Sequence, residues 1–173
     1  MKTYLIEWHG PFSPEEVDDA IRNSLAFYGN GLYLITGKGS NAEKDSKLKY
    51  VGKTSIDYQQ RFKNHHALKK IRYPQLWLGN IVSPENITND DLELAEHILI
   101  YFSDYGLVNQ MKIKSPPKSS GIVLSTWFKT DGSPRMRRTS PLRNHADVLI
   151  WDNDTQTLHF TQKLNVFNPF CAE

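Results

Sequence analysis

Cysteine is nearly missing from the sequence, and its scarcity excludes two kinds of cross-link. Cys171 is the only cysteine among 173 residues, so the chain has neither an intrachain disulfide nor a zinc site built from several thiolates. Internal repeats and low-complexity tracts are missing as well, and the length is that of one domain. We therefore expect a single domain over residues 1–173.

Long apolar runs are also missing. No stretch approaches the ~20 apolar residues that a helix needs to cross a bilayer. The first apolar stretch of the chain soon reaches Glu7 and is too short for a secretory signal. From these two observations we expect a cytoplasmic protein without a membrane partner.

The sequence has little net charge, but its charges are unevenly distributed. The net charge is +2, whereas residues 46–72 and residues 111–145 each contain eight Lys or Arg and one acid. Residues 73–110, between these blocks, contain six acids and no Lys or Arg. Two basic blocks on a near-neutral chain are typical of a protein that binds a polyanion, although two solvated faces would have the same composition.

The patterns that are present predict a mixed α+β protein, with a small sheet and helices packed on it. Ser13 and Thr88 are typical capping residues and mark two helix starts. A polar, turn-rich loop between two short strands predicts an antiparallel hairpin. The predicted elements in chain order are a strand over residues 2–8, a helix from Ser13, strands over 31–35 and 49–52, a helix from about Ser55 to Ile71, a strand over 75–82, a helix from Thr88, a strand over 122–128, and a terminal hairpin over 147–152 and 157–163.

One ordered set of residues is more specific than any of its members. A strand tyrosine usually packs in the core, and a helical Arg or His usually lies on the surface. The set consists of Gly31-Leu32-Tyr33, Tyr50-Val51-Gly52-Lys53, Arg61 with His65, Glu96 and Asn109. In this order it resembles the motifs of the GIY-YIG nuclease superfamily over roughly residues 30–110. In both tripeptides one aliphatic residue replaces another and the tyrosine is intact, whereas the charged insert over residues 36–48 departs from the family pattern.

The resemblance implies a fold and an activity. The expected fold is α+β, with a GIY-YIG core over residues 30–110 in which a small mixed or antiparallel sheet is flanked by helices. An N-terminal strand–helix addition and a basic, β-rich extension over residues 111–173 complete it. The expected activity is metal-dependent hydrolysis of DNA phosphodiester bonds by a restriction or defence endonuclease, with Mg²⁺ or Mn²⁺. Two other hypotheses stay open, a catalytically silent nucleic-acid-binding module and an RNA nuclease.

The resemblance also implies a role for each matched residue. Glu96 is expected to bind the metal and Arg61 to steady the phosphate. Tyr33 is expected to activate the attacking water. The side chains expected to support this chemistry are Tyr50, Lys53 and His65, and Asn109 is expected to hold the end of the helix that carries Glu96.

Elementary chemistry favours these residue types. A hard divalent cation prefers carboxylate, phosphate and water oxygens, so Glu96 is a suitable ligand, with Glu93 one turn earlier as its competitor. The planar guanidinium of Arg61 matches phosphate oxygens, and the four-residue spacing places Arg61 and His65 on one helix face. A tyrosine has an ordinary pKa near ~10 and is a poor base at neutral pH unless cations favour the phenolate. The residues leave open which of the two tyrosines activates the attacking water.

The second basic block predicts the DNA contact. Basic side chains bound to phosphates supply affinity that does not depend on sequence, and some Arg side chains can read guanine edges. The predicted contacts are Arg135, Arg137, Arg138 and Arg143, although a flexible basic loop would have the same sequence. Because one matched set gives one active site, we expect a homodimer when both DNA strands are cut.

Overall fold

The computed structural model describes residues 1–23, 31–63, 65–103 and 107–163. Within these residues, no helix is long and apolar enough to cross a membrane. The elements in chain order are β1 (Lys2–Phe12), α1 (Pro14–Asn23), β2 (Gly31–Lys38), β3 (Lys47–Thr54), α2 (Tyr58–Lys63), β4 (Arg72–Ser83), α3 (Asn89–Tyr101), β5 (Gly121–Phe128), the 3-10 turn η2 (Ser140–Leu142), β6 (Val148–Asp152) and β7 (Thr157–Thr161).

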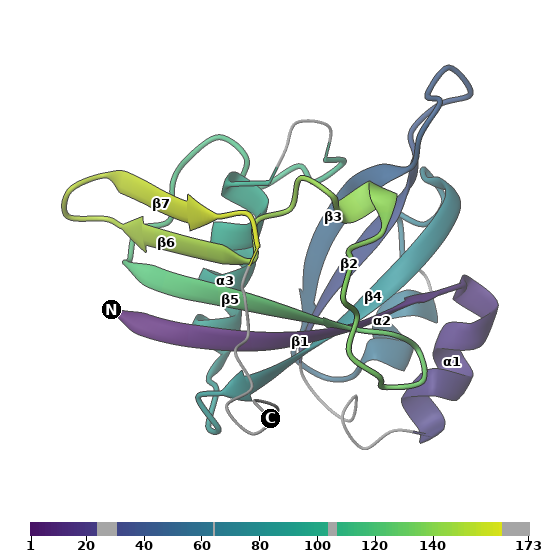
Figure 1. The fold of residues 1–173 in the computed structure, drawn as a ribbon, viewed down its shortest axis with the longest axis horizontal. Helices are drawn as coiled ribbons and strands as arrows, with labels where there is room; N and C mark the ends of the chain where they lie inside the picture. Colours follow the sequence, from purple (N-terminus) through teal and green to yellow (C-terminus); the bar gives the residue numbers. More distant parts are fainter. Residues whose placement is uncertain (24–30, 64, 104–106, 164–173) are drawn as a thin grey trace, which may run out of the picture.

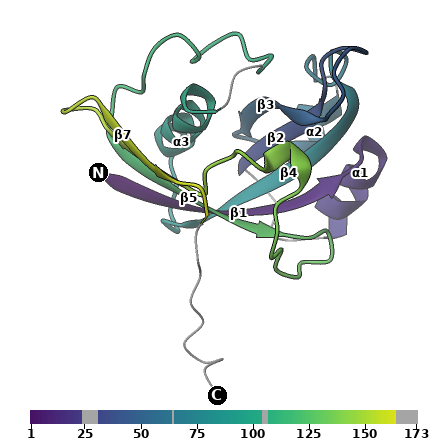
Figure 2. The ribbon, with the colours of Figure 1, turned by 45° about the horizontal axis from the view of Figure 1, so that its top comes forward.

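One sheet contains all of these strands, in the order β3-β2-β4-β1-β5-β6-β7 (Figure 1). Neighbouring strands are antiparallel except β1 and β5, which run parallel from the pair Lys2 and Gly121 onward. The sheet is therefore mixed. Figure 2 shows that it curls strongly, into a half-barrel with α3 inside the curve.

This architecture corrects the fold expected from the sequence. The prediction of a small sheet flanked by helices, with an addition at one end and an extension at the other, is wrong. Strand β1 lies at the centre of the sheet, between β4 and β5, and strands β5 to β7 continue the same sheet. The sequence pattern marked these strands but not their partners, because β1 pairs with a strand far along the chain.

Two predicted helix starts are confirmed. Before α1, the Ser13 Oγ accepts the Glu16 N–H at 3.2 Å, and the Glu16 carboxylate accepts the Ser13 N–H at 2.8 Å. Before α3, Thr88 and Asp91 make the same reciprocal pair of bonds. Each pair satisfies N–H groups that the first turn of a helix leaves without a partner.

The long helix predicted from Ser55 to Ile71 is wrong, because α2 contains only Tyr58–Lys63. Asp57 caps its start, with the Gln60 N–H donating to the carboxylate at 2.6 Å. Beyond its end, the ring Nδ1 of His65 accepts the Ala67 N–H at 3.2 Å. That side chain takes a backbone donor which a continuing helix would give to a carbonyl.

The two faces of the sheet carry separate apolar cores. Leu32 and Val51 pack with α3, whereas Tyr33 and Tyr50 pack on the other face with α1 and α2. Since side chains alternate along a strand, the tyrosines of both tripeptides point away from α3. The sheet therefore separates the tyrosines from the helix that carries Glu96.

Candidate functional site

The glycines of both tripeptides are required by the rings packed against them. Strand pairing places Tyr33 opposite Gly52, and a Cβ added at Gly52 would lie 2.3 Å from the Tyr33 Cζ. A Cβ added at Gly31 would lie 1.9 Å from the hydroxyl of Tyr58. That hydroxyl bonds the carbonyl oxygens of two core strands. Neither glycine can be exchanged without moving an aromatic ring.

Two side chains from α2 and the turn after it converge on the hydroxyl of Tyr33. The Arg61 Nε donates to this oxygen at 2.8 Å, and the His65 Nε2 lies 2.7 Å from it. The sequence predicted that Arg61 and His65 would lie close together. A turn brings them together, however, instead of the shared helix face that the spacing indicated.

The contacts of His65 determine which of its ring nitrogens carries the proton. Its Nδ1 accepts the Ala67 N–H, so in the neutral ring the proton is on Nε2, which donates to Tyr33. Burial, together with the smaller effect of the positive charge of Arg61, lowers the pKa of His65 to about 4. His65 is therefore neutral near pH 7 and acts as a donor to the tyrosine.

The hydroxyl of Tyr33 is fully buried and lies inside a hydrogen-bond network. Burial raises the pKa of Tyr33, and Tyr50 raises it further, while the opposing effect of Arg61 is smaller. The rings of Tyr33 and Tyr50 stack, with 5.9 Å between their centroids. Arg61 and His65 both donate to the Tyr33 oxygen, so its acceptor capacity is used within the protein.

A pocket of about 400 Å³ opens beside this network, at the end of β3. It is lined by Lys53, Arg61, His65 and His66, among other residues. Arg61 is exposed, and its guanidinium carbon lies 5.9 Å from the centroid of the Tyr33 ring. Three of the residues matched to the nuclease motifs, Lys53, Arg61 and His65, thus share one pocket, here called the cationic pocket. His66 also lines it and stacks on His65, with 5.2 Å between ring centroids.

Glu93 and Glu96 of α3 lie on the other face of the sheet, and both contact the ammonium of Lys112. The Lys112 Nζ is bonded to Glu96 and lies 2.5 Å from a Glu93 oxygen. Burial lowers the pKa of Lys112, but the two carboxylates outweigh burial and raise the pKa above its usual range. Lys53 bonds Glu93 at 3.0 Å and therefore joins this cluster to the pocket around β3.

The two carboxylates fit a divalent cation only with help from other ligands. The described ranges contain no group of three or more His, Cys, Asp or Glu that could hold a metal ion. Glu93 and Glu96, however, already converge on one positive charge, and a hard cation binds such oxygens together with water and phosphate. The residues thus fit Mg²⁺ or Mn²⁺ if the ammonium of Lys112 moves away.

Lys112 is the site residue that the sequence did not single out. It belongs to a loop in a basic block, and no periodicity connects it with α3. Asn109 has a different contact from the expected one. Its side chain bonds both the N–H and the carbonyl of Val51, at 3.1 and 2.8 Å, so it caps the outer edge of β3 instead of the end of α3.

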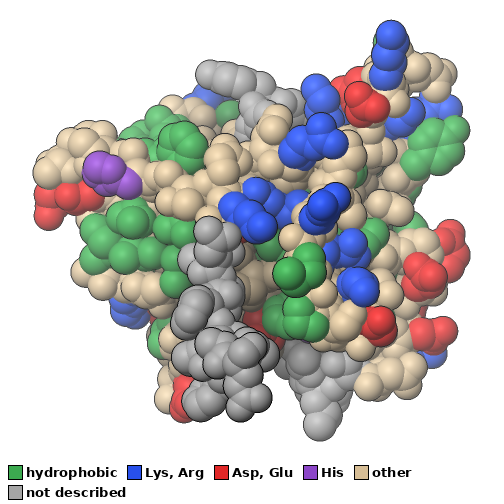
Figure 3. Space-filling model, viewed as in Figure 1, with side chains coloured by type: hydrophobic (Ala, Val, Ile, Leu, Met, Phe, Trp, Pro, Cys, Tyr) green, Lys and Arg blue, Asp and Glu red, His purple; other side chains and the backbone are tan. Residues whose placement is uncertain are grey.

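The four arginines predicted to contact DNA line one pocket of about 660 Å³. Arg135 donates to a backbone carbonyl at 2.9 Å, and Arg138 lies 3.5 Å from the carboxylate of Asp147. Arg137 and Arg143 are exposed. Figure 3 shows Lys and Arg side chains gathering on this face, around η2 and the loop before it.

Comparisons with known proteins add no relative to this description. No family model, no curated protein and no solved structure matches the chain. The function therefore has to be argued from the side chains themselves.

The lowered pKa of His65 gives a prediction that NMR can test. Because the unfolded chain takes up a proton near the ordinary value of ~6.5, His65 destabilises the folded protein as the pH falls from about 6.5 to about 4. Arg61→Gln removes a positive charge, so the pKa of His65 should rise. An NMR titration of the ring measures it, and an unchanged or lower pKa in the variant contradicts the described contact.

Proposed function

We propose that the protein is a metal-dependent endonuclease that hydrolyses phosphodiester bonds in DNA, in a restriction or defence role in the cytoplasm. One observation carries the proposal: Lys53, Arg61 and His65 line one pocket, and a buried tyrosine hydroxyl orients two of them. The proposal rests on these side chains and not on the small flanked sheet expected from the sequence, which is wrong.

Arg61 and Lys53 would bind the phosphate. The Nε of Arg61 is used by Tyr33, which fixes the plane of the guanidinium and leaves its exposed edge toward the pocket. A planar fork of donors matches two phosphate oxygens. A second positive charge, from Lys53, would stabilise the negative charge that develops on the phosphate oxygens.

Tyr50, and not Tyr33, would meet the attacking water. Tyr33 has no exposed surface, whereas Tyr50 retains 7% of its surface and stacks on the Tyr33 ring. The structure thus gives a reason to exchange the roles expected from the sequence. Tyr33 and His65 would position Arg61 and Tyr50, and Tyr50 would orient the water.

Glu96, with Glu93 beside it, would hold the divalent cation. A bound Mg²⁺ or Mn²⁺ would withdraw charge from the phosphate and lower the pKa of its water. Lys112 now neutralises both carboxylates, and Lys53 links them to the phosphate pocket. Exchange of the ammonium for a divalent cation would raise the local charge by one unit, which the negative charge of a bound phosphodiester would offset.

The duplex would extend over the basic surface around η2. Arg137 and Arg143 are exposed and suit phosphate contacts that do not depend on sequence. Arg135 and Arg138 already have partners within the chain, so they would support the shape of this surface. We propose a homodimer for cleavage of both strands, since each chain offers one such pocket.

Cleavage of supercoiled plasmid in Mg²⁺ tests the proposed function. Arg61→Gln should slow nicking by about 10² or more, because it removes a positioned donor and a charge. Lys63→Gln, on the same helix, is the matched control and should nick like the unsubstituted protein. Equal rates for the two variants, or no nicking by the unsubstituted protein, would sink the proposal. An RNA substrate in the same assay separates the DNA nuclease from an RNA nuclease.

The same assay ranks the two tyrosines. Tyr50→Phe should be the slower variant in single-turnover reactions, since it removes the hydroxyl nearest the pocket. Tyr33→Phe should lose less rate but should shift the ring signals of His65 in NMR spectra. The reverse ranking would assign the orientation of the attacking water to Tyr33 and leave the nuclease proposal in place.

Removal of the ammonium should strengthen metal binding. Lys112→Met removes the ammonium that Glu93 and Glu96 share, so Mn²⁺ should bind about tenfold more tightly, a change of ~1.4 kcal/mol. Lys114→Met, on an exposed residue of the same loop, is the control. Electron paramagnetic resonance of Mn²⁺ measures the affinity directly. Unchanged affinity in Lys112→Met contradicts the assignment of the metal to these carboxylates.

One observation favours a second function, the catalytically silent nucleic-acid-binding module. Lys112 already neutralises the carboxylates that a metal would use. Such a module would bind DNA through the same cationic surface without cutting it. DNA binding by the unsubstituted protein with neither nicking nor Mn²⁺ binding would establish this function instead.

A further inference from the structure

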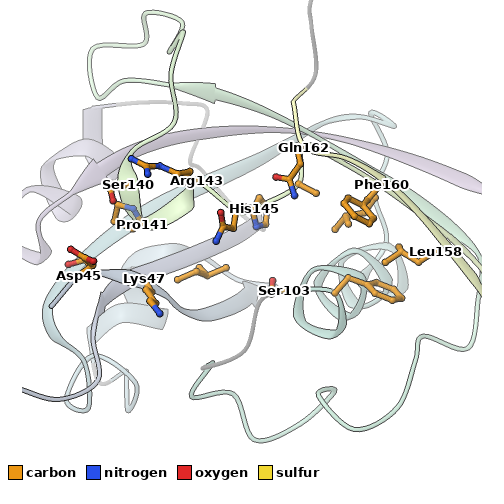
Figure 4. Close-up of a pocket in the computed structure, with 16 residues that line it drawn as sticks. Asp45, Lys47, Ser103, Ser140, Pro141, Arg143, His145, Leu158, Phe160 and Gln162 are labelled. Carbon is orange, nitrogen blue, oxygen red and sulfur yellow. The ribbon is translucent and has the colours of Figure 1, made fainter. Parts of the chain in front are cut away.

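A second pocket, with a volume of about 510 Å³, lies at the opposite end of β3 from the cationic pocket. Five parts of the chain form it: the start of β3, the segment after α3, the segment around η2, and strands β6 and β7. In Figure 4 the labelled Ser140 and Arg143 lie on one side, Leu158 and Phe160 on another, and His145 between them. Its volume is in the range of pockets that hold small organic ligands.

The apolar part of this pocket includes an aromatic side chain that is mostly exposed. Phe160 on β7 is 58% exposed, although a hydrophobic ring gains nothing from contact with water. Phe102 also lines the pocket and is fixed by Trp151, with 5.2 Å between ring centroids. The pocket thus offers one fixed and one exposed aromatic ring, the kind of surface on which a planar ligand stacks.

The polar part contains a buried ring nitrogen that has no partner. His145 is only 8% exposed, and within the described residues its Nε2 makes no hydrogen bond. Trp127 holds the ring edge-to-face, with 5.5 Å between ring centroids. Burial lowers the pKa of His145 to about 4, so the ring is neutral near pH 7. A buried polar atom without a partner is uncommon in proteins and suits a ligand that completes its hydrogen bonding.

The charged part of the pocket is cationic. Lys47 and Arg143 are exposed on its lining, and Asp45 is the one acid among the described lining residues. The amide side chains of Asn144 and Gln162 add donors and acceptors that match the edge of a heterocyclic base. The lining therefore combines stacking surface, hydrogen bonds for a polar edge, and charge for an anion.

We propose that this pocket binds a nucleobase, with the attached phosphate held by Lys47 and Arg143. The base stacks on Phe160, and the Nε2 of His145, which is buried in the free protein, becomes its partner when the ring turns toward the pocket. The choice of a nucleotide over another planar anion rests on the proposed nuclease function. Two ligands could supply such a base and phosphate: a free mononucleotide, or a base turned out of a DNA strand.

The position of the pocket relates it to the cleavage site. Lys47 and Lys53 stand near the two ends of β3, and six residues at ~3.3 Å each place them about 20 Å apart. At ~3.4 Å for each base step, that distance corresponds to about six steps of B-form DNA. A base held in this pocket would thus fix the register of a duplex whose backbone is cut at the far end of β3.

Fluorescence titration of the full chain without divalent cation tests this inference. The probes are the mononucleotide of 2-aminopurine and a DNA oligonucleotide that contains 2-aminopurine. Phe160→Ala should weaken binding by about 5- to 150-fold, as loss of one aromatic–base stack does. His159→Ala, the neighbouring residue on β7 whose side chain points to the other face of the strand, is the matched control and should bind like the unsubstituted protein.

The outcomes separate the sources and the two proposals. Binding of the mononucleotide identifies a free-nucleotide site, and binding of the oligonucleotide alone identifies a base turned out of a strand. In either case the NMR signal of the His145 Nε2 should shift at saturation. Binding without plasmid nicking keeps this inference and removes the nuclease. Equal affinity of Phe160→Ala and His159→Ala, or no binding of either probe, overturns the inference whether or not the protein cuts DNA.

Discussion

The buried hydroxyl of Tyr33 is the point on which the candidate site depends. Two donors from outside the sheet, Arg61 and His65, reach one oxygen that has no exposed surface. Gly52 makes room for the ring, and Tyr50 stacks on it. Without this oxygen, nothing on the described face would hold the guanidinium in one plane. Its burial also explains why Tyr33 is suited to positioning other groups and not to contact with substrate.

Strand β3 connects the separate parts of the molecule, because it is the edge of the sheet. Alternation sends Tyr50 to one face and Val51 to the other, and the edge is the place where the two faces meet. Lys53 uses that position, since it bonds a carboxylate of α3 and lines the cationic pocket. Asn109 satisfies the outer backbone groups of Val51, which protects an edge that would otherwise pair with another chain.

Local features were predictable from the sequence, and long-range ones were not. Ser13 and Thr88 mark helix starts because capping depends on residues three apart. The pairing of β1 with β5 and the bond from Lys112 to Glu96 depend on loops that bring distant segments together, and no spacing reveals them. The prediction of a helix through His65 was wrong because the ring of His65 accepts a backbone N–H, a side-chain contact that helix propensity does not describe.

Cleavage of DNA in water enriched in ¹⁸O tests the central claim most directly, because it follows the bond that the proposed reaction makes. If the protein hydrolyses a phosphodiester, each new terminal phosphate contains one ¹⁸O atom from the solvent, and mass spectrometry of the fragments detects it. The account predicts one label for each cut in Mg²⁺ or Mn²⁺. Intact DNA, or new ends without label, would contradict it.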